Sequence, residues 1–258
     1  MKTTSIIRIL TKDLGTFHAN IHKLFVRDNN HSNMSSLELI PLKSRTKKVC
    51  YKACIKDESS MRFVPLHLIT ESFINSVYIK HIGILEFIPI VAITADICSM
   101  CCKRYGNSLQ YVPKQFITAE LCLTACVANG TSLQFVPKKY ITKKLCLISC
   151  IGESFAITFV PEKMLTQELC SIICKSDGKA LEYIPKNMIT YDMCLDCCIS
   201  FGCSLRLVPE DMITEDMCLF ACKNMCYSVR YVPKKFLTQE FYSIVLTYNP
   251  VAADFVRT

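Results

Sequence analysis

Eighteen of the 258 residues are cysteine, and fourteen of these form pairs separated by three residues. The seven pairs are Cys50/Cys54, Cys98/Cys102, Cys122/Cys126, Cys146/Cys150, Cys170/Cys174, Cys194/Cys198 and Cys218/Cys222. A thiol can bind a metal ion, form a disulfide, act as a nucleophile or pack as a small apolar side chain. Which of these chemistries applies depends on the secondary structure that carries the pairs and on whether it exposes or buries the thiols.

Each chemistry sets its own requirements. Zinc sites usually combine two cysteine pairs with two-residue gaps, or cysteines with histidines; here the gap is three. The five histidines fall outside the cysteine pattern: His18, His22, His31, His67 and His81. A nucleophilic thiol needs a base and a partly exposed, electropositive setting. We therefore interpret the pairs as reduced, buried packing groups, with a zinc site and a ladder of disulfides between repeats as the alternatives.

The pairs belong to a repeat. Nine prolines follow one another at intervals of 24 residues, and a threonine stands five residues after each. The prolines are Pro41, Pro65, Pro89, Pro113, Pro137, Pro161, Pro185, Pro209 and Pro233. The threonines are Thr46, Thr70, Thr94, Thr118, Thr142, Thr166, Thr190, Thr214 and Thr238. A fixed period of this length is typical of a repeat array in which each unit contacts only its neighbours.

The second half of each repeat predicts a helix of about 10–12 residues. Its threonine is a natural N-cap, and seven of the nine are followed within two residues by an acid that suits the helix dipole. Apolar residues then fall on one face, and we expect Leu121, Cys122, Ala125 and Cys126 to be buried. We also expect left-handed C-terminal caps at Gly106, Gly130, Gly178 and Gly202.

The first half of each repeat has an aliphatic residue four before the proline, usually an aromatic residue two before it, and Val or Ile directly before it. This pattern fits a short helix that is kinked at the proline, which is our prediction. An extended step followed by one helical turn that the proline starts is a second possibility, and a strand, giving a β/α solenoid, is a third. We predict an all-α fold, an α-solenoid of helix–turn–helix repeats with a period of 24.

We divide the chain into an atypical N-terminal cap (1–35), nine 24-residue helical repeats (36–251) and a C-terminal tail (252–258). The first two repeats depart from the pattern. Ser44 and Arg45 replace the usual apolar pair after Pro41, and Ile74 and Tyr78 stand at the cysteine positions.

The composition limits the setting and the partners. The first 20 residues lack the apolar run of a signal peptide, and no stretch of 18 apolar residues follows. We expect a cytoplasmic protein that is not secreted and has no membrane partner. The net charge is +8, with a basic cluster at Lys43, Arg45, Lys47 and Lys48. Because nothing resembles a recognition helix or a stacking motif, we do not expect a nucleic-acid partner.

The segment SLQYVPKQFITAELCLTACVANG, from Ser108 to Gly130, resembles short helical repeats of the form ALxYVPExLxTxELCLxAVxxNG. These repeats form a family of unknown function in uncharacterised proteins of giant amoeba viruses and of some bacteria. The resemblance covers Ser36 to about Val251; Cys126 stands where the family commonly has valine. It implies a helical repeat fold and carries no known activity or functional residues.

The chain has no glycine-rich phosphate loop, no G-x-S-x-G and no H-E-x-x-H motif. We therefore do not expect an enzyme or a cofactor, and we assign no catalytic, cofactor-binding or metal-binding residue. Stacked helices create an extended surface, so the predicted function is a protein–protein interaction scaffold whose partner the sequence does not identify. The alternative is a metal- or redox-responsive protein that uses the repeated CxxxC ladder.

Overall fold

The computed structural model describes residues 37–252 and Phe255. The described chain forms two compact units, one in residues 37–92 and the other beginning at Ile93. The predicted N-terminal cap, residues 1–35, lies outside the described residues, as does most of the predicted tail. Both units are built from the same 24-residue helical repeat, so the predicted all-α solenoid is confirmed.

Each repeat ends in one α-helix, which has ten residues except for α4 with eight. The α-helices are α3 (Lys47–Lys56), α4 (Glu71–Tyr78), α5 (Ala95–Arg104), α6 (Ala119–Ala128), α7 (Lys143–Gly152), α8 (Gln167–Ser176), α9 (Tyr191–Ser200), α10 (Glu215–Asn224) and α11 (Gln239–Tyr248). This length is within the predicted range.

The first half of the repeat is made of 3-10 helices. The longer ones are η2 (Glu58–Phe63), η4 (Ile84–Phe87), η6 (Gly106–Tyr111), η8 (Gly130–Phe135), η10 (Ser154–Phe159), η12 (Gly178–Glu182), η14 (Gly202–Leu207) and η16 (Cys226–Tyr231). Three-residue ones follow the prolines: η1 (Leu42–Ser44), η3 (Leu66–Leu68), η5 (Ile90–Ala92), η7 (Lys114–Phe116), η9 (Lys138–Tyr140), η11 (Glu162–Met164), η13 (Lys186–Met188), η15 (Glu210–Met212) and η17 (Lys234–Phe236). One more, η18 (Pro250–Ala252), comes after α11.

The predicted kinked helix is wrong, and the extended alternative is right. Val112 (φ −73°, ψ 127°) and Pro113 (φ −58°, ψ 139°) are extended and separate η6 from η7. A residue before proline avoids helical geometry, so the first helix ends there. The Pro113 carbonyl then accepts the Phe116 N–H at 2.9 Å and starts a new turn. No strand occurs among the residues that the structure describes.

The threonine caps are confirmed in all nine repeats. Each threonine is extended, and its Oγ1 accepts the N–H of the third residue after it at 3.1–3.4 Å. In α6, for example, Thr118 accepts the Leu121 N–H at 3.1 Å. The hydroxyl thereby satisfies one of the free amides of the first helical turn.

The predicted left-handed glycine caps are wrong, because no described glycine has a positive φ. The glycines instead begin the next 3-10 helix, at a point where two repeats come very close. A Cβ on Gly130 would overlap the carbonyl oxygen of Ser149 in the following repeat, and one on Gly106 would overlap that of Ala125. Glycine is needed there for close approach of the backbone and not for its backbone dihedral angles.

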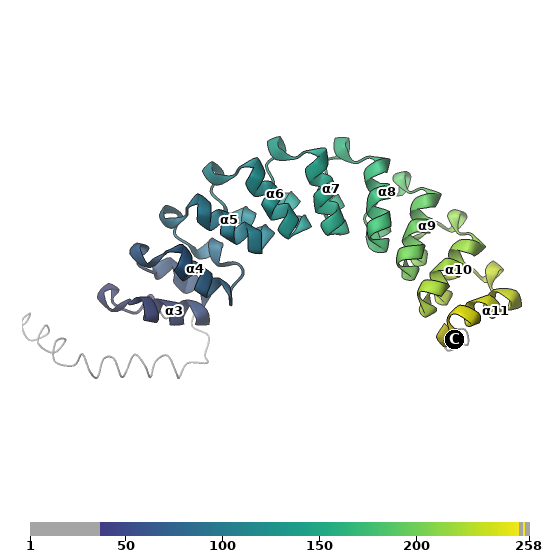
Figure 1. Cartoon of the computed structure of the whole chain (residues 1–258), viewed down its shortest axis with the longest axis horizontal. Coiled ribbons are helices and arrows are strands. Elements are labelled where there is room, and N and C mark those ends of the chain that lie inside the picture. The colour runs from purple at the N-terminus through teal and green to yellow at the C-terminus, as the bar shows by residue number, and fades with distance from the viewer. Residues whose placement is uncertain (1–36, 253–254, 256–258) are drawn as a thin grey trace, which may run out of the picture. The chain divides into compact units, whose positions relative to one another are not determined.

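The repeats stack in two columns. In residues 93–252 each α-helix from α5 to α10 contacts the next α-helix, and η6, η8, η10, η12, η14 and η16 contact one another in the same sequential way. Figure 1 shows α5–α11 following one another in a single row. In residues 37–92, α3 contacts α4 and η2 contacts η4. The predicted core residues Leu121, Cys122, Ala125 and Cys126 are buried, as expected.

Candidate functional site

The cysteine pairs form a continuous ladder inside the row of α-helices from α5 to α10. The second thiol of one repeat lies beside the first thiol of the next, five times over: Cys102 with Cys122, Cys126 with Cys146, Cys150 with Cys170, Cys174 with Cys194, and Cys198 with Cys218. Sixteen of the eighteen cysteines are buried, and all eighteen are free thiols. The predicted burial of the pairs is confirmed.

Burial also determines what the ladder can do chemically. It raises the pKa of the Cys102, Cys150 and Cys198 thiols to about 12, and the adjacent thiols add to the increase because two thiolates would repel. These thiols therefore stay protonated and unreactive at neutral pH, since the thiolate is the nucleophile and the metal ligand. Within the described residues, no three His, Cys, Asp or Glu side chains are grouped so that they could hold a metal ion.

A more promising feature is the outward side of the α-helices. We define the outer helix face as the exposed apolar side chains of α6–α10: Leu123, Val127, Ile151, Ile172, Ile199 and Phe220. They fall 10, 11 or 14 residues after the proline, opposite the buried positions 8, 9, 12 and 13. Their exposed fractions run from 36% for Ile172 to 66% for Val127.

The outer helix face is more apolar than packing of the repeat requires. A surface helix normally has polar residues opposite its buried side. In α6, Leu121 and Cys122 are buried, yet Leu123 and Val127 on the other side are also apolar. Exposed apolar residues that recur over neighbouring elements are typical of interaction surfaces.

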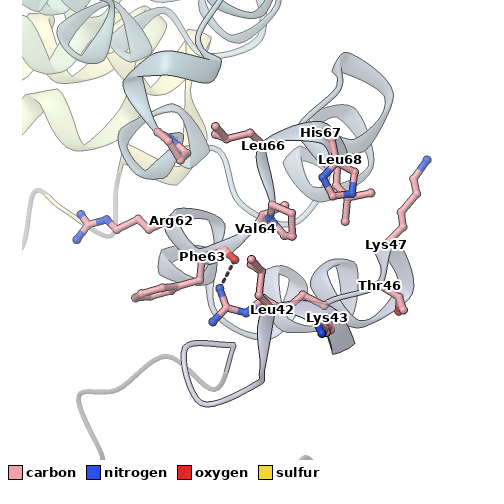
Figure 2. A pocket seen from close by; sticks show the side chains of 13 residues that line it. Leu42, Lys43, Thr46, Lys47, Arg62, Phe63, Val64, Leu66, His67 and Leu68 are labelled. Carbon is pink, nitrogen blue, oxygen red and sulfur yellow. Dashed lines mark hydrogen bonds between the residues drawn. The ribbon is translucent and has the colours of Figure 1, made fainter.

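A second feature is a pocket in residues 37–92, which we call the turn pocket. It has a volume of about 960 Å³ and lies between the turns that follow Pro41 and Pro65; Pro89 also lines it. The apolar part of its lining comes from Leu42, Phe63, Val64, Pro65, Leu66 and Leu68. Figure 2 shows Leu42 and Val64 at the centre, with Lys47 and Arg62 on opposite sides.

Basic side chains surround the turn pocket. Lys43, Arg45, Lys47, Arg62 and His67 line it, and no acidic residue does. Arg45 is held in place by the backbone: its Nε donates to the Ile40 carbonyl and its Nη1 to the Phe63 carbonyl, both at 2.8 Å. The Arg62 guanidinium lies over the Phe87 ring, 5.0 Å from its centre. Neither Lys43 nor Lys47 forms an ion pair with another described residue.

Sequence reasoning assigned no site residue and missed both surfaces. The sequence feature that could have indicated the turn pocket is an apolar residue directly after the proline. It occurs in the first three repeats, as Leu42, Leu66 and Ile90. The same position is charged in the six later repeats: Lys114, Lys138, Glu162, Lys186, Glu210 and Lys234. The signal for the outer helix face was the presence of apolar residues on both sides of the second helix.

Comparisons of the chain with protein-family models, with curated proteins and with solved structures found no match. Among the described helices, none has the length and apolar character of a membrane span.

Proposed function

We propose that the chain is a non-catalytic helical-repeat scaffold that binds a partner protein through the outer helix face. The observation that carries the proposal is the recurrence of exposed apolar side chains over five consecutive helices, α6–α10. Covering such surface contributes about 25 cal/mol per Å² of apolar area removed from water. A row of short helices presents these contributions along one extended surface, which suits a long or multi-part partner.

The remaining parts of the proposal follow from the same features. Sixteen buried free thiols suit a reducing compartment, so we place the protein in the cytoplasm (of the host, if the protein is viral). The turns of the later repeats alternate in charge, with Lys138 and Lys234 basic and Glu162 and Glu210 acidic, which does not favour nucleic acid. The resemblance to the giant-virus and bacterial repeat family is part of this proposal, and it adds no activity.

The alternative of a metal- or redox-responsive protein lacks a comparable supporting observation. Its candidate ligands are the ladder thiols, and burial favours their protonated form. Metal analysis of protein purified without chelators distinguishes the two proposals. The scaffold predicts no stoichiometric zinc, iron or copper, whereas the alternative predicts about one metal ion per two cysteine pairs.

Position-specific photo-crosslinking tests the scaffold. A photoreactive phenylalanine analogue at Val127, Ile151 or Ile199 should give a discrete covalent adduct with another protein in cells that make this chain. The same analogue at Gln115 or Asn187, which are exposed two residues after their prolines, is the matched control. Adducts that form equally from both sets, or only from the control positions, would contradict the proposal.

A further inference from the structure

We propose that the turn pocket binds an acidic, leucine-rich or phenylalanine-rich segment of a partner protein, an inference that rests on the scaffold function proposed above. The pocket has two parts. Its apolar floor includes Leu42 and Leu66, and its basic rim includes Lys43, Lys47, Arg62 and His67; no acidic residue lines either part. The two parts together select one class of ligand, a peptide with alternating apolar and acidic side chains.

The apolar floor is not a requirement of the repeat. Leu42 and Leu66 are 66% and 54% exposed, although both occupy the first position after the proline, where the six repeats from Pro113 onward have Lys or Glu. Charged residues are therefore compatible with this turn, and they would avoid exposing apolar surface to water. An exposed pair of leucines at a site that tolerates lysine is better explained by a ligand than by folding.

The basic rim fixes the sign of the ligand's charge. Lys43, Lys47 and His67 are exposed, and Arg62 lies on the other side of the pocket with its guanidinium over the Phe87 ring. The pocket also includes Thr46, the N-cap of α3, whose first turn contains no acid; the positive end of the helix dipole therefore adds to the field. Such a field attracts carboxylates and speeds the association of an acidic partner.

The acids nearest in sequence do not neutralise the rim. The Glu58 carboxylate is engaged by His81, whose Nδ1 is 3.4 Å from its Oε2. Glu38, Glu71 and Glu86 are not part of the lining. The Glu38 backbone carbonyl accepts a hydrogen bond from Arg45 Nη2 at 3.2 Å. The carboxylates that complete the site must therefore come from the ligand.

The two parts also exclude simpler ligands. Inorganic phosphate would use the basic rim and leave Leu42 and Leu66 exposed. A nucleic acid would likewise use the charge, and a base could stack on Phe63, but it would leave the aliphatic Leu42 and Leu66 without apolar contacts; a single-stranded oligonucleotide is therefore part of the test. A volume of about 960 Å³ is enough for several side chains of a peptide.

The test uses the full chain and three fluorescein-labelled peptides of about twelve residues, a length typical of groove-binding segments. The first alternates Leu with Glu or Asp, the second replaces each acid by Lys, and the third replaces each Leu by Ser. In fluorescence anisotropy at ~0.1 M salt, we expect the first peptide to bind at least roughly tenfold more tightly than either of the others.

Two variants assign the binding to the turn pocket. Lys43→Glu/Lys47→Glu should weaken binding of the acidic leucine peptide by roughly tenfold or more, and Leu42→Ser/Leu66→Ser should weaken it by about fivefold. The matched control is Lys139→Glu/Lys143→Glu, which changes the same two positions of the Pro137 repeat, and it should leave binding unchanged. All four lysines and both leucines are exposed, so circular dichroism should show folded variants.

Equal binding of the three peptides, an equal loss in the control pair, or tighter binding of a single-stranded oligonucleotide than of the acidic leucine peptide would each overturn the inference. The scaffold proposal is tested separately, by crosslinks from Val127 and Ile199. Such crosslinks without peptide binding would remove the turn pocket as a docking site and leave the outer helix face.

Discussion

Residues 37–92 and residues 93–252 share one 24-residue spacing but hold their repeats together by different contacts. In residues 93–252, glycines at the start of a 3-10 helix let the backbone of one repeat approach a carbonyl of the next, as Gly130 does at Ser149. In residues 37–92 the same position holds Glu58 and Ile82. There Arg45 and His81 reach the Phe63 and Ile55 carbonyls of a neighbouring repeat, at 2.8 and 3.0 Å.

The cores differ in the same way. The thiol ladder runs through α5–α10, whereas α4 has Ile74 and Tyr78 in place of its cysteines. Small residues allow close packing of many identical units, while larger and polar side chains join units whose sequences have diverged. The 24-residue spacing therefore does not determine which contacts join one repeat to the next. We expect the two regions to respond differently to alkali, to added methyl groups and to the loss of a single guanidinium.

The largest expected difference is in alkaline stability. Burial raises the pKa of ten thiols of residues 93–252 to about 11 or 12, and the group comprises Cys98, Cys101, Cys102, Cys122, Cys150, Cys170, Cys194, Cys198, Cys218 and Cys222. The pKa of these thiols in the folded protein exceeds the ordinary value near 9. Their contribution to the free energy of unfolding is therefore fully present below pH ~9, and it is lost as the pH rises toward 12. Within that window, each such thiol lowers the free energy of unfolding by up to about 1.4 kcal/mol per pH unit. Ten of them together are therefore comparable with the roughly 5–15 kcal/mol of a typical domain.

We therefore expect residues 93–252 to unfold at a lower alkaline pH than residues 37–92, which contain only Cys50 and Cys54. Short pulses of iodoacetamide at increasing pH, followed by peptide mapping, report which thiols become accessible first. Both regions contain lysines and tyrosines, which also change charge at alkaline pH. Their ionisation therefore does not by itself make one region unfold before the other. Simultaneous labelling of Cys54 and Cys150 would contradict the prediction.

The next effect concerns close approach in residues 93–252. Gly130→Ala places a methyl group against the Ser149 carbonyl oxygen and 3.1 Å from the Glu153 Cβ, so we expect a loss of about 1–3 kcal/mol of unfolding free energy. Urea denaturation measures it. The matched control is Gly152→Ala at the end of α7, where nothing lies within 4 Å of the added Cβ. That variant should be neutral or more stable by up to about 1 kcal/mol, and equal destabilisation by the two would contradict the close-approach role.

A similar effect is expected at Arg45, now confined to residues 37–92. Arg45→Met keeps the apolar stem and removes hydrogen bonds to the Ile40, Phe63 and Glu38 carbonyls, so we expect a loss of about 1–3 kcal/mol. Amide exchange of residues 37–63 should accelerate, while that of α6–α10 stays the same. Lys48→Met, an exposed change nearby, should alter stability by less than ~0.5 kcal/mol. Faster exchange in α6–α10 would show that the two regions unfold as one.

The sequence predicted what depends on local chemistry and spacing. The threonine caps, the length of the α-helices and the buried cysteine pairs each follow from a side chain acting on its own helix, and all are confirmed. The predicted left-handed cap at Gly130 is wrong. Glycine is needed there because a Cβ would overlap the Ser149 carbonyl oxygen, which belongs to another repeat and is not visible in the local sequence. In the sequence, Arg45 is only a departure from the apolar pattern of the repeat. Its three hydrogen-bond acceptors are backbone carbonyls. Every residue type supplies such a carbonyl, so the sequence does not predict these hydrogen bonds.

The smallest effect compares the same cap in two repeats of residues 93–252. Thr142→Ala removes the hydroxyl that accepts the Leu145 N–H at 3.2 Å, and it should cost about 0.5–2 kcal/mol. The first turn of α7 contains Lys143 and Lys144 and no acid, so nothing else offsets the positive end of the dipole. Thr190→Ala should cost less, because Asp192 remains in the first turn of α9. Since each repeat contacts only its neighbours, faster amide exchange should be confined to α7 and the helices beside it. Equal costs for the two variants would mean that the hydroxyl alone stabilises the helix start and that the charge in the first turn contributes nothing measurable.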